Sequence, residues 1–395
     1  MYLRRFGKTE LKISVLTLGA MRIPEEQGED PILHHERVSK TLRRGLDLGI
    51  NHIETARGYG SSESLIGRAL SDGLIKREEF ILTTKIGPTQ TAEDFCKNLE
   101  DSMSRMNVDY VDILDIHGIN TQGLLDLTMK KGGCMDAVQK AIDEKIIGHI
   151  GFSTHGPLQV IMNTINTNAF ESVNLHYYYF NQYNRPAVDL ATEKDMGVFI
   201  ISPSDKGGLL FNPPQKLVDL CAPYFPIQMN QRWLLSQEKV HTLSLGAAKA
   251  EEFDAHLPGV EKEGPLTPHE EEIFERLHAA LEILGDTYCS FCHACLPCPE
   301  DVHIPEILRL RNMASAYDMV EFGKYRYKMF AQHDPETGKR VGGADHWFPG
   351  SQGDFCTNCG ECLPRCPLNL PIPALLKETH QALAGEVGKR LWEDK

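Results

Sequence analysis

Short apolar segments alternate with amphipathic helical patterns along the first two thirds of this sequence. Eight segments have the length and composition of buried strands: Leu16–Leu18, Ile50–Ile53, Phe80–Thr84, Tyr110–Ile116, Ile147–Phe152, Phe170–Leu175, Val198–Ile201 and Thr242–Leu245. Strands that are apolar on both faces and alternate with helices are typical of parallel sheets. Eight such units predict an α/β fold, a closed (β/α)8 TIM barrel. An open doubly wound sheet is the alternative, but no G-x-G-x-x-G motif follows the first strand.

The chain is longer than a barrel requires. A barrel of this type takes about 250 residues, whereas the chain has 395. The stretch Pro258–Pro268 is rich in Pro, Gly and Glu and predicts a loop, and a helix with Pro268 at its start is expected to end before Gly285. We therefore predict a barrel over residues 1–285 and a second domain over residues 286–395.

Composition excludes several classes of partner. The formal net charge is −14 and no basic patch is present, so no nucleic-acid partner is expected. Hydrophobic residues make up 41% of the chain, but no segment is apolar enough to span a bilayer. Residues 1–14 lack the apolar core of a signal peptide. These features predict a cytoplasmic protein without a membrane partner.

Eight of the 11 cysteines lie between Cys289 and Cys366. In a cytoplasmic chain such a cluster indicates metal ligation rather than disulfides. The second run has the C-x2-C-x2-C-x3-C-P spacing of bacterial ferredoxins, and the first is one residue shorter before its last cysteine. Structural zinc is the alternative, but zinc sites use pairs of cysteines rather than runs of three. We predict two [4Fe–4S] clusters.

The fourth cysteine of a ferredoxin run commonly ligates the other cluster. This rule assigns one cluster to Cys289, Cys292, Cys295 and Cys366, and the other to Cys356, Cys359, Cys362 and Cys298. Each run leads into a helical pattern, at Glu306–Met313 and at Ala374–Leu383. The predicted second domain is therefore small, mainly α-helical and ferredoxin-like. The scattered Cys96, Cys134 and Cys221 are expected to be ordinary buried thiols.

Four polar side chains follow predicted strands two, three and four. Glu54 and Tyr59 come after the second strand, Lys85 after the third and His117 after the fourth. Barrel active sites lie at the C-terminal ends of the strands. An acid, a phenol, an amine and an imidazole are therefore expected to converge at one mouth.

Here the sequence resembles the aldo-keto reductase family over about residues 1–255. Ile53–Gly60 is similar to the family signature, which has Asp where this chain has Glu54, and Lys85 and His117 match the other two catalytic positions. The opening Phe6–Thr9, the strand end Ile150–Ser153 and the loop Ser202–Gly208 are similar too. With the cysteine runs added, the chain resembles the iron–sulfur branch of the family.

The resemblance implies an oxidoreductase that interconverts small carbonyl compounds and alcohols. Tyr59 would protonate the carbonyl oxygen, Lys85 would lower the pKa of that phenol, Glu54 would hold Lys85, and His117 would orient the substrate. NADP(H) or NAD(H) would donate hydride. Ser153 and Asn174 match the positions where the family binds the nicotinamide carboxamide. The loop from Ser202, with Lys206, suits phosphate because barrels often bind phosphate after their last strands. Lys249 could reach a 2′-phosphate, with an ordinary surface lysine as the alternative.

Two other functions fit the sequence. The chain would be an electron-transfer subunit if the barrel bound a ligand without carbonyl chemistry, and a flavin- or ferredoxin-dependent reductase if flavin replaced the nicotinamide. In either case a one-electron carrier protein is the expected partner. A nicotinamide transfers two electrons together and a [4Fe–4S] cluster transfers one, so direct exchange between them is poor. We therefore expect the clusters not to take part in hydride transfer at Tyr59.

Overall fold

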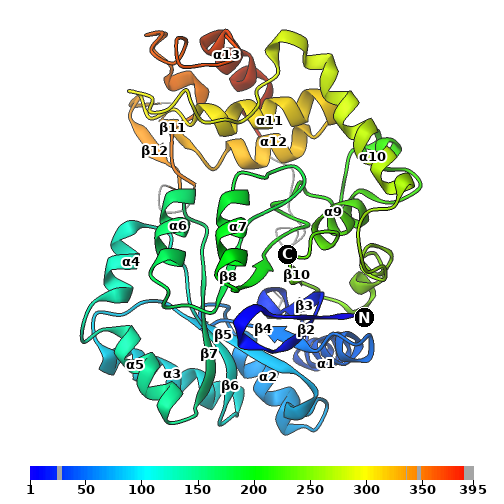
Figure 1. Ribbon diagram of the computed structural model, residues 1–395, viewed down its shortest axis with the longest axis vertical. Helices are drawn as coiled ribbons and strands as arrows, with labels where there is room; N and C mark the ends of the chain where they lie inside the picture. Colours follow the sequence, from blue (N-terminus) through cyan, green and yellow to red (C-terminus); the bar gives the residue numbers. More distant parts are fainter. Residues whose placement is uncertain (25–28, 335, 345–347, 387–395) are drawn as a thin grey trace. The chain divides into compact units, whose positions relative to one another are not determined.

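The computed structural model describes residues 1–24, 29–334, 336–344 and 348–386 (Figure 1). The chain divides into two compact units. The first combines Met1–Gly207 with Ile227–Pro265, and the second combines Gly208–Pro226 with the chain from Leu266 onward. The predicted domain boundary at residue 285 falls inside the second unit, and the end of the predicted second domain, residues 387–395, lies outside the described residues.

The first unit is a closed barrel of parallel strands. Within the described residues, the strands follow one another around the barrel in chain order, and the last pairs with the first. They are β3 Leu16–Gly19, β4 His52–Glu54, β5 Ile81–Ile86, β6 Val111–Ile116, β7 Ile147–Ser153, β8 Ser172–Leu175, β9 Gly197–Ile200 and β10 Thr242–Leu245. Each overlaps a predicted strand, so the predicted (β/α)8 barrel is confirmed.

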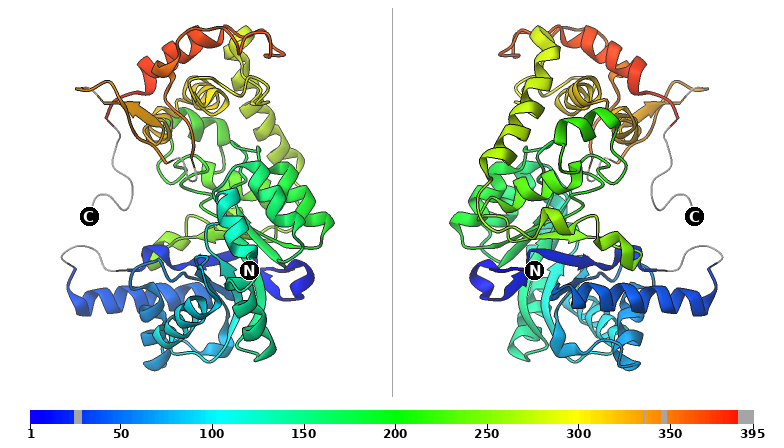
Figure 2. Two further views of the ribbon diagram at one scale, coloured as in Figure 1. Left: turned by 90° about the vertical axis from the view of Figure 1, so that its left-hand side faces the viewer. Right: turned by 90° about the vertical axis from the view of Figure 1, so that its right-hand side faces the viewer.

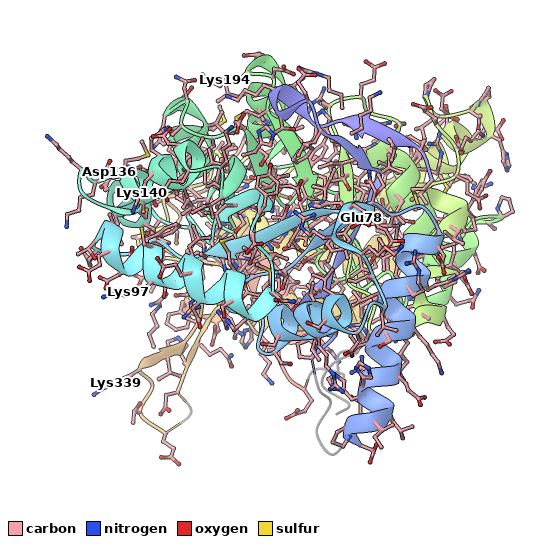
Figure 3. All side chains as sticks on the ribbon, turned by 90° about the horizontal axis from the view of Figure 1, so that it is seen from below. Glu78, Lys97, Asp136, Lys140, Lys194 and Lys339 are labelled. Carbon is pink, nitrogen blue, oxygen red and sulfur yellow. The ribbon has the colours of Figure 1, made fainter. Side chains whose placement is uncertain are left out.

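Helices surround the barrel (Figure 2). They are α1 Pro31–Asp47, α2 Ser62–Ser71, α3 Ala92–Met106, α4 Gln122–Met129, α5 Cys134–Asp143, α6 Leu158–Asn166, α7 Arg185–Glu193 and α9 Pro226–Leu235. Their apolar faces pack on the strands because each strand is buried on both sides. Charged side chains such as Lys97 on α3 and Lys140 on α5 point outward (Figure 3).

An antiparallel hairpin precedes the barrel and closes its N-terminal end. Its strands are β1 Leu3–Arg5 and β2 Lys12–Ser14. Phe6, 1% exposed, packs with Ile13 of the hairpin and with Ile113 and Phe199 of the barrel strands. A Cβ on Gly197 would stand 2.7 Å from the Phe6 ring, so only glycine admits the ring at this place. This apolar plug forms the floor of the barrel.

The second unit is mainly helical. Its helices are α8 Gln215–Cys221, α10 Pro268–Ala279, α11 Ile304–Tyr317, α12 Val320–Tyr327 and α13 Ile372–Leu383. A short hairpin joins β11 Ala331–His333 to β12 Arg340–Gly342. The helix predicted from Pro268 is capped by Thr267 and ends its α-helical part at Ala279, before a 3-10 turn whose Gly285 has a φ of 45°. No helix of the described ranges is long and apolar enough to cross a membrane.

Candidate functional site

The predicted catalytic side chains meet at the C-terminal mouth of the barrel. Glu54 ends β4, Lys85 lies in β5, and His117 follows β6 directly. Tyr59 lies in the turn after β4, where its amide donates to the carbonyl of Ala56. Parallel strands end at the same edge of the barrel, and this places the four side chains together, as the sequence predicted.

Lys85 is the centre of the group. It is 1% exposed, and its ammonium contacts the Glu54 carboxylate, so the expected contact is present in spite of the longer Glu side chain. Its Nζ also lies 3.1 Å from the carbonyl oxygen of Thr55 and 3.2 Å from the Tyr59 hydroxyl oxygen. Three acceptors require three N–H donors, which only the charged ammonium provides.

Tyr59 lies between a cation and an imidazole. Its hydroxyl accepts from Lys85 and donates to Glu54 Oε1 at 3.4 Å. The Lys85 ammonium lies 4.7 Å from the centre of the Tyr59 ring. The ring of His117 meets the Tyr59 ring edge to face, with centroids 5.8 Å apart. The phenol and the imidazole therefore border the same space at the mouth.

Burial dominates the proton affinities of this site. It raises the pKa of Tyr59, and the carboxylate of Asp115 adds to the rise. The sequence predicted a lowered Tyr59 pKa next to Lys85, whereas burial and Asp115 raise it. Burial, helped by Lys85, lowers the pKa of His117 to about 4. Burial also lowers the pKa of Lys85, although Asp115 opposes the shift. Near neutral pH the phenol keeps its proton and His117 is neutral.

Asp115 belongs to this site and was not predicted. It pairs in register with Lys85 across β5 and β6 and is 1% exposed. Its Oδ2 accepts from Asn174 Nδ2 at 2.6 Å, and its Oδ1 has no hydrogen-bond partner among the described residues. Burial raises its pKa to about 6, against the opposing effects of Lys85 and Asn174. The strand Val111–Ile116 contains two carboxylates, Asp112 and Asp115, and only the strand register tells which of them pairs with Lys85.

The residues predicted to bind the nicotinamide cofactor lie on three neighbouring parts of the barrel. Ser153 and Asn174 pair in register at the ends of β7 and β8. Ser202 has a φ of 52°, and its carbonyl accepts from the amide of Lys206 in the turn after β9. Lys249 is exposed in the loop after β10. Asn174 contacts the catalytic group through its bond to Asp115, and Ser153 accepts from the amide of Gly118, next to His117. Among the described residues, no hydrogen bond joins Lys249 to the other cofactor residues.

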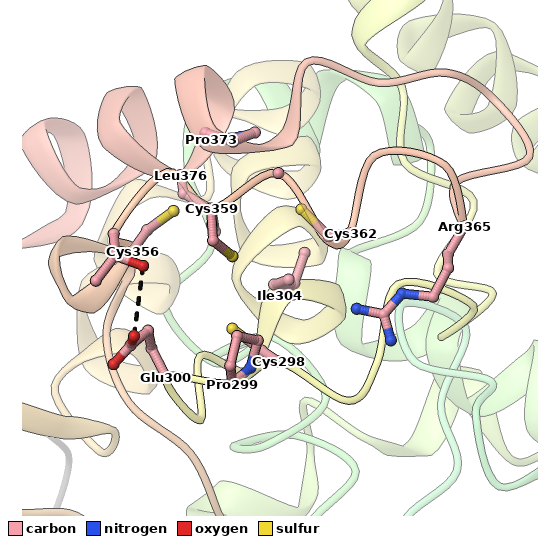
Figure 4. Close-up of a pocket in the computed structure, with 12 residues that line it drawn as sticks. Cys298, Pro299, Glu300, Ile304, Cys356, Cys359, Cys362, Arg365, Pro373 and Leu376 are labelled. Carbon is pink, nitrogen blue, oxygen red and sulfur yellow. Dashed lines mark hydrogen bonds between the residues drawn. The ribbon is translucent and has the colours of Figure 1, made fainter.

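The eight clustered cysteines line two pockets in the second unit. One pocket is lined by Cys298, Cys356, Cys359 and Cys362, whose sulfur atoms turn toward a shared space beside Ile304 (Figure 4). The other is lined by Cys289, Cys292, Cys295 and Cys366. Each pocket contains three cysteines of one run and the last cysteine of the other. The grouping is the one that the ferredoxin crossing rule assigns.

The rest of each pocket is mostly apolar or backbone. Ile304 and Leu376 border the pocket of Cys298, beside Arg365 and Glu300. Pro305, Leu308 and Ile372 border the pocket of Cys366. Burial raises the pKa of the Cys295 thiol to about 12. Within the described ranges, no three His, Cys, Asp or Glu side chains are close enough to hold a single metal ion. Thiols that surround a cubane are farther apart than thiols around one ion.

The remaining cysteines lie elsewhere. Cys96 is on α3, Cys134 begins α5, and Cys221 ends α8. Cys134 and Cys221 are buried, and none of the three lines either cysteine pocket. Cys96 is half-buried.

Known proteins resemble the barrel half of this chain. The model of the Aldo/keto reductase family matches residues 15–277. L-galactose dehydrogenase from Arabidopsis thaliana is 31% identical over 213 residues, 51% of this chain and 64% of that protein. An aldo-keto reductase from Mycobacterium avium is 27% identical over 289 residues, 70% of this chain and 90% of that protein. An aldo-keto reductase from Klebsiella pneumoniae, solved in complex with NADPH, has a TM-score of 0.56 at 20% identity and covers 70% of this chain and 94% of that one.

Proposed function

This chain belongs to the aldo/keto reductase family, and from that premise we propose that its barrel interconverts a small carbonyl compound and its alcohol with NAD(P)H. The observation that carries the proposal is the buried group of Glu54, Lys85 and Tyr59 beside His117. It supplies a protonated phenol, a fixed cation next to it, and a neutral imidazole at the same mouth.

Tyr59 is the proposed proton donor. When its proton moves to the substrate oxygen, the phenolate that remains lies 3.2 Å from the Lys85 ammonium. That cation stabilises the phenolate, and it does so strongly because the site is shielded from water. Glu54 holds Lys85 in place and balances its charge. The four groups therefore favour the transition state, in which negative charge forms on oxygen, over the neutral ground state.

His117 is the proposed orienting group. With a pKa of about 4 it is neutral across the working pH range. A neutral imidazole donates one hydrogen bond to the substrate oxygen without competing with Tyr59 as an acid. Asp115 pairs in register with Lys85 and accepts a hydrogen bond from Asn174. It therefore connects the proton-transfer group with the proposed nicotinamide contact on β8.

Ser153, Asn174, Ser202 and Lys206 fit a nicotinamide nucleotide. Ser153 and Asn174 pair at the ends of adjacent strands and offer a hydroxyl and an amide to a carboxamide. The turn after β9 suits a phosphate, because barrels often bind phosphate in the loops after their last strands. A bound reduced nicotinamide supplies the hydride that reaches the carbonyl carbon. The NADPH in the Klebsiella pneumoniae relative favours the same cofactor here.

The test is a reduction assay on anaerobically purified protein. Short aldehydes with NADPH and with NADH should give turnover, and Lys85→Met should abolish it while cofactor binding, measured by fluorescence, persists. A protein that binds neither nucleotide and carries extractable flavin would reject the nicotinamide proposal and support the flavin-dependent alternative.

We further propose that the second unit holds two [4Fe–4S] clusters. The two pockets offer four thiols each and mostly apolar walls, a donor set that suits iron–sulfur cubanes. Cys289, Cys292, Cys295 and Cys366 would hold one, and Cys298, Cys356, Cys359 and Cys362 the other. Such clusters supply one-electron transfer when bound. The unit would then either exchange electrons with an external one-electron carrier or have a ferredoxin-like structural role.

The crossed grouping of the cysteines can be tested by comparing single-cysteine variants of the two runs. Cys298→Ser, although in the first run, should perturb the same cluster as Cys359→Ser. Electron paramagnetic resonance of the reduced variants should therefore show the same surviving signal for both, and the complementary signal for Cys366→Ser. Stoichiometric zinc with little iron in fresh wild-type protein would reject the clusters.

A further inference from the structure

Asp115 is a buried carboxyl group to which the proposed proton transfer gives no task of its own. It is 1% exposed and lies in β6, where it pairs in register with Lys85 on one side and with Gly151 on the other. Among the described residues Asp115 forms no ion pair, since the Lys85 ammonium contacts Glu54 instead. A buried carboxylate without a paired cation is costly, so a role for this side chain is expected.

One oxygen of the carboxyl is bonded to the proposed nicotinamide contact. Oδ2 of Asp115 accepts from Nδ2 of Asn174 on β8 at 2.6 Å. Because the nitrogen of this amide is turned toward the carboxyl, its oxygen is directed away and can accept from the carboxamide of a cofactor. Asp115 therefore fixes the orientation of the Asn174 amide.

The other oxygen borders a small space that glycine leaves open. A Cβ on Gly151 would stand 2.2 Å from Oδ1 of Asp115 and 2.2 Å from Oγ of Ser172. Neither of these oxygen atoms has a hydrogen-bond partner among the residues that the structure describes. After a small shift, the Ser172 hydroxyl can donate to the ionised carboxylate or accept from the protonated acid. This side of Asp115 therefore accommodates both protonation states.

The groups around Asp115 determine what its ionisation does to the site. The titratable side chains that face it or contact its neighbours are Glu54, Tyr59, Lys85 and His117. Glu54 and Lys85 balance each other, Tyr59 and His117 are neutral near pH 7, and the neighbours of Asp115 on β7 and β8 are uncharged. Ionised Asp115 thus adds one negative charge, and burial accordingly raises its pKa to about 6.

The two redox forms of a nicotinamide differ by one charge. The oxidised ring is a cation, whereas the reduced ring is neutral. A ring whose carboxamide is held by Asn174 would be bound by the same amide that contacts Asp115. Opposite charges attract strongly in a site shielded from water, so ionised Asp115 would stabilise the oxidised form and not the reduced form.

We propose that Asp115 sets the redox preference of the cofactor site, so that the oxidised nicotinamide nucleotide binds more tightly than the reduced one and releases the proton of Asp115 as it binds. Asp115 is a positioning residue, because it acts through its charge and through Asn174. This inference rests on the proposed nicotinamide site and adds to it a discrimination between the two forms of the cofactor.

The test measures the dissociation constants of NADP⁺ and NADPH by calorimetry on the anaerobic holoprotein. Their ratio cancels the 2′-phosphate, which both nucleotides carry. In the wild type the preference for NADP⁺ should rise roughly tenfold from about pH 5.5 to about pH 8, because Asp115 is ionised above its pKa. In Asp115→Asn most of this rise should disappear. Asp112→Asn, on the same strand but bonded to Arg77, is the matched control and should keep the rise.

Proton release provides an independent measurement. Near pH 6, calorimetry in two buffers of different ionisation enthalpy should show NADP⁺ binding releasing about half a proton more than NADPH binding, and this difference should be lost in Asp115→Asn. A wild type that binds neither nucleotide rejects the proposed cofactor site itself. A wild type that binds both, with a preference that does not change with pH or that changes equally in Asp115→Asn, overturns this inference alone.

Discussion

The catalytic group of the barrel and the two cysteine pockets are both gathered from distant parts of the chain, but they differ in how their charges are balanced. In the barrel, the ammonium of Lys85 contacts the carboxylate of Glu54 and lies near Asp115. Each cysteine pocket instead gathers four groups of one kind. Thiolates brought together repel one another unless cations lie between them. The barrel site therefore balances its charges with its own residues, whereas the cysteine pockets would need the proposed clusters to hold four thiolates together.

The strongest test of the barrel half removes one oxygen atom. Tyr59→Phe should reduce turnover by about 10²-fold or more, the usual contribution of a proton-transfer group. Circular dichroism should be unchanged, because the ring still packs beside His117. Tyr110→Phe, at the opposite end of β6, is the control and should retain activity. Wild-type turnover in Tyr59→Phe would show that another group donates the proton.

The next test removes one thiol. Cys359→Ser should lose about half of the iron and sulfide found in the wild type, which is expected to hold about eight irons per chain. The loss should stop at one half because the second pocket keeps all its own thiols. Cys96→Ser, outside both pockets, should retain full iron content. Loss of all iron would mean that the two pockets are not independent.

A third test concerns His52, a buried histidine inside the barrel. His52 lies between Thr17 and Thr83 inside the barrel, and burial together with Lys85 lowers its pKa to about 3. The unfolded chain therefore takes up a proton below about pH 6.5 that the folded chain does not, so stability falls as pH drops. From pH 7 to pH 5 this one histidine should cost about 2 kcal/mol.

Urea denaturation at the two pH values measures that cost. In His52→Gln the difference between pH 7 and pH 5 should shrink by that amount, whereas His278→Gln, on the exposed side of α10, should leave it unchanged. An unchanged difference in His52→Gln would show that the folded barrel leaves the pKa of this ring at its ordinary value.

The smallest expected effect tests whether reduction in the barrel is independent of the clusters in the second unit. Cys292→Ser should remove one cluster yet leave NADPH-dependent reduction of an aldehyde within about twofold of the wild type, about 0.4 kcal/mol in barrier height. The reason is that hydride transfer and proton donation use groups of the barrel alone. A large loss with an intact barrel and normal cofactor binding would indicate an electron path between the halves.

The barrel could be predicted from the sequence because its strands are apolar on both faces and its catalytic side chains follow those strands directly. The hairpin β1–β2 was missed, since Leu3–Arg5 and Lys12–Ser14 are short and carry charged residues. Asp115 was missed because its meaning depends on the strand register that brings it beside Lys85. Register is a property of the closed sheet, and no local pattern reports it.

The second unit was predicted less completely. The cysteine spacing is a local pattern and led to the same crossed grouping that the pockets have. The inclusion of Gly208–Pro226 in this unit was not predicted, because the segment lies between two barrel strands in the sequence.

In the barrel, the raised pKa of Tyr59 was also not predicted, since the extent of burial follows from the packed fold.

The apolar floor made by Phe6 and its neighbours fills the N-terminal end of the barrel, so ligands of the Tyr59 group would enter at the C-terminal mouth. If the proposed nucleotide and its substrate share that mouth, the ligand that enters first is the last to leave. A nucleotide seated deep against Ser153 and Asn174 would thus be retained until the smaller molecule above it had departed. Under the proposed function, turnover would then follow a compulsory order, and the slow departure of the deeper ligand would limit its rate.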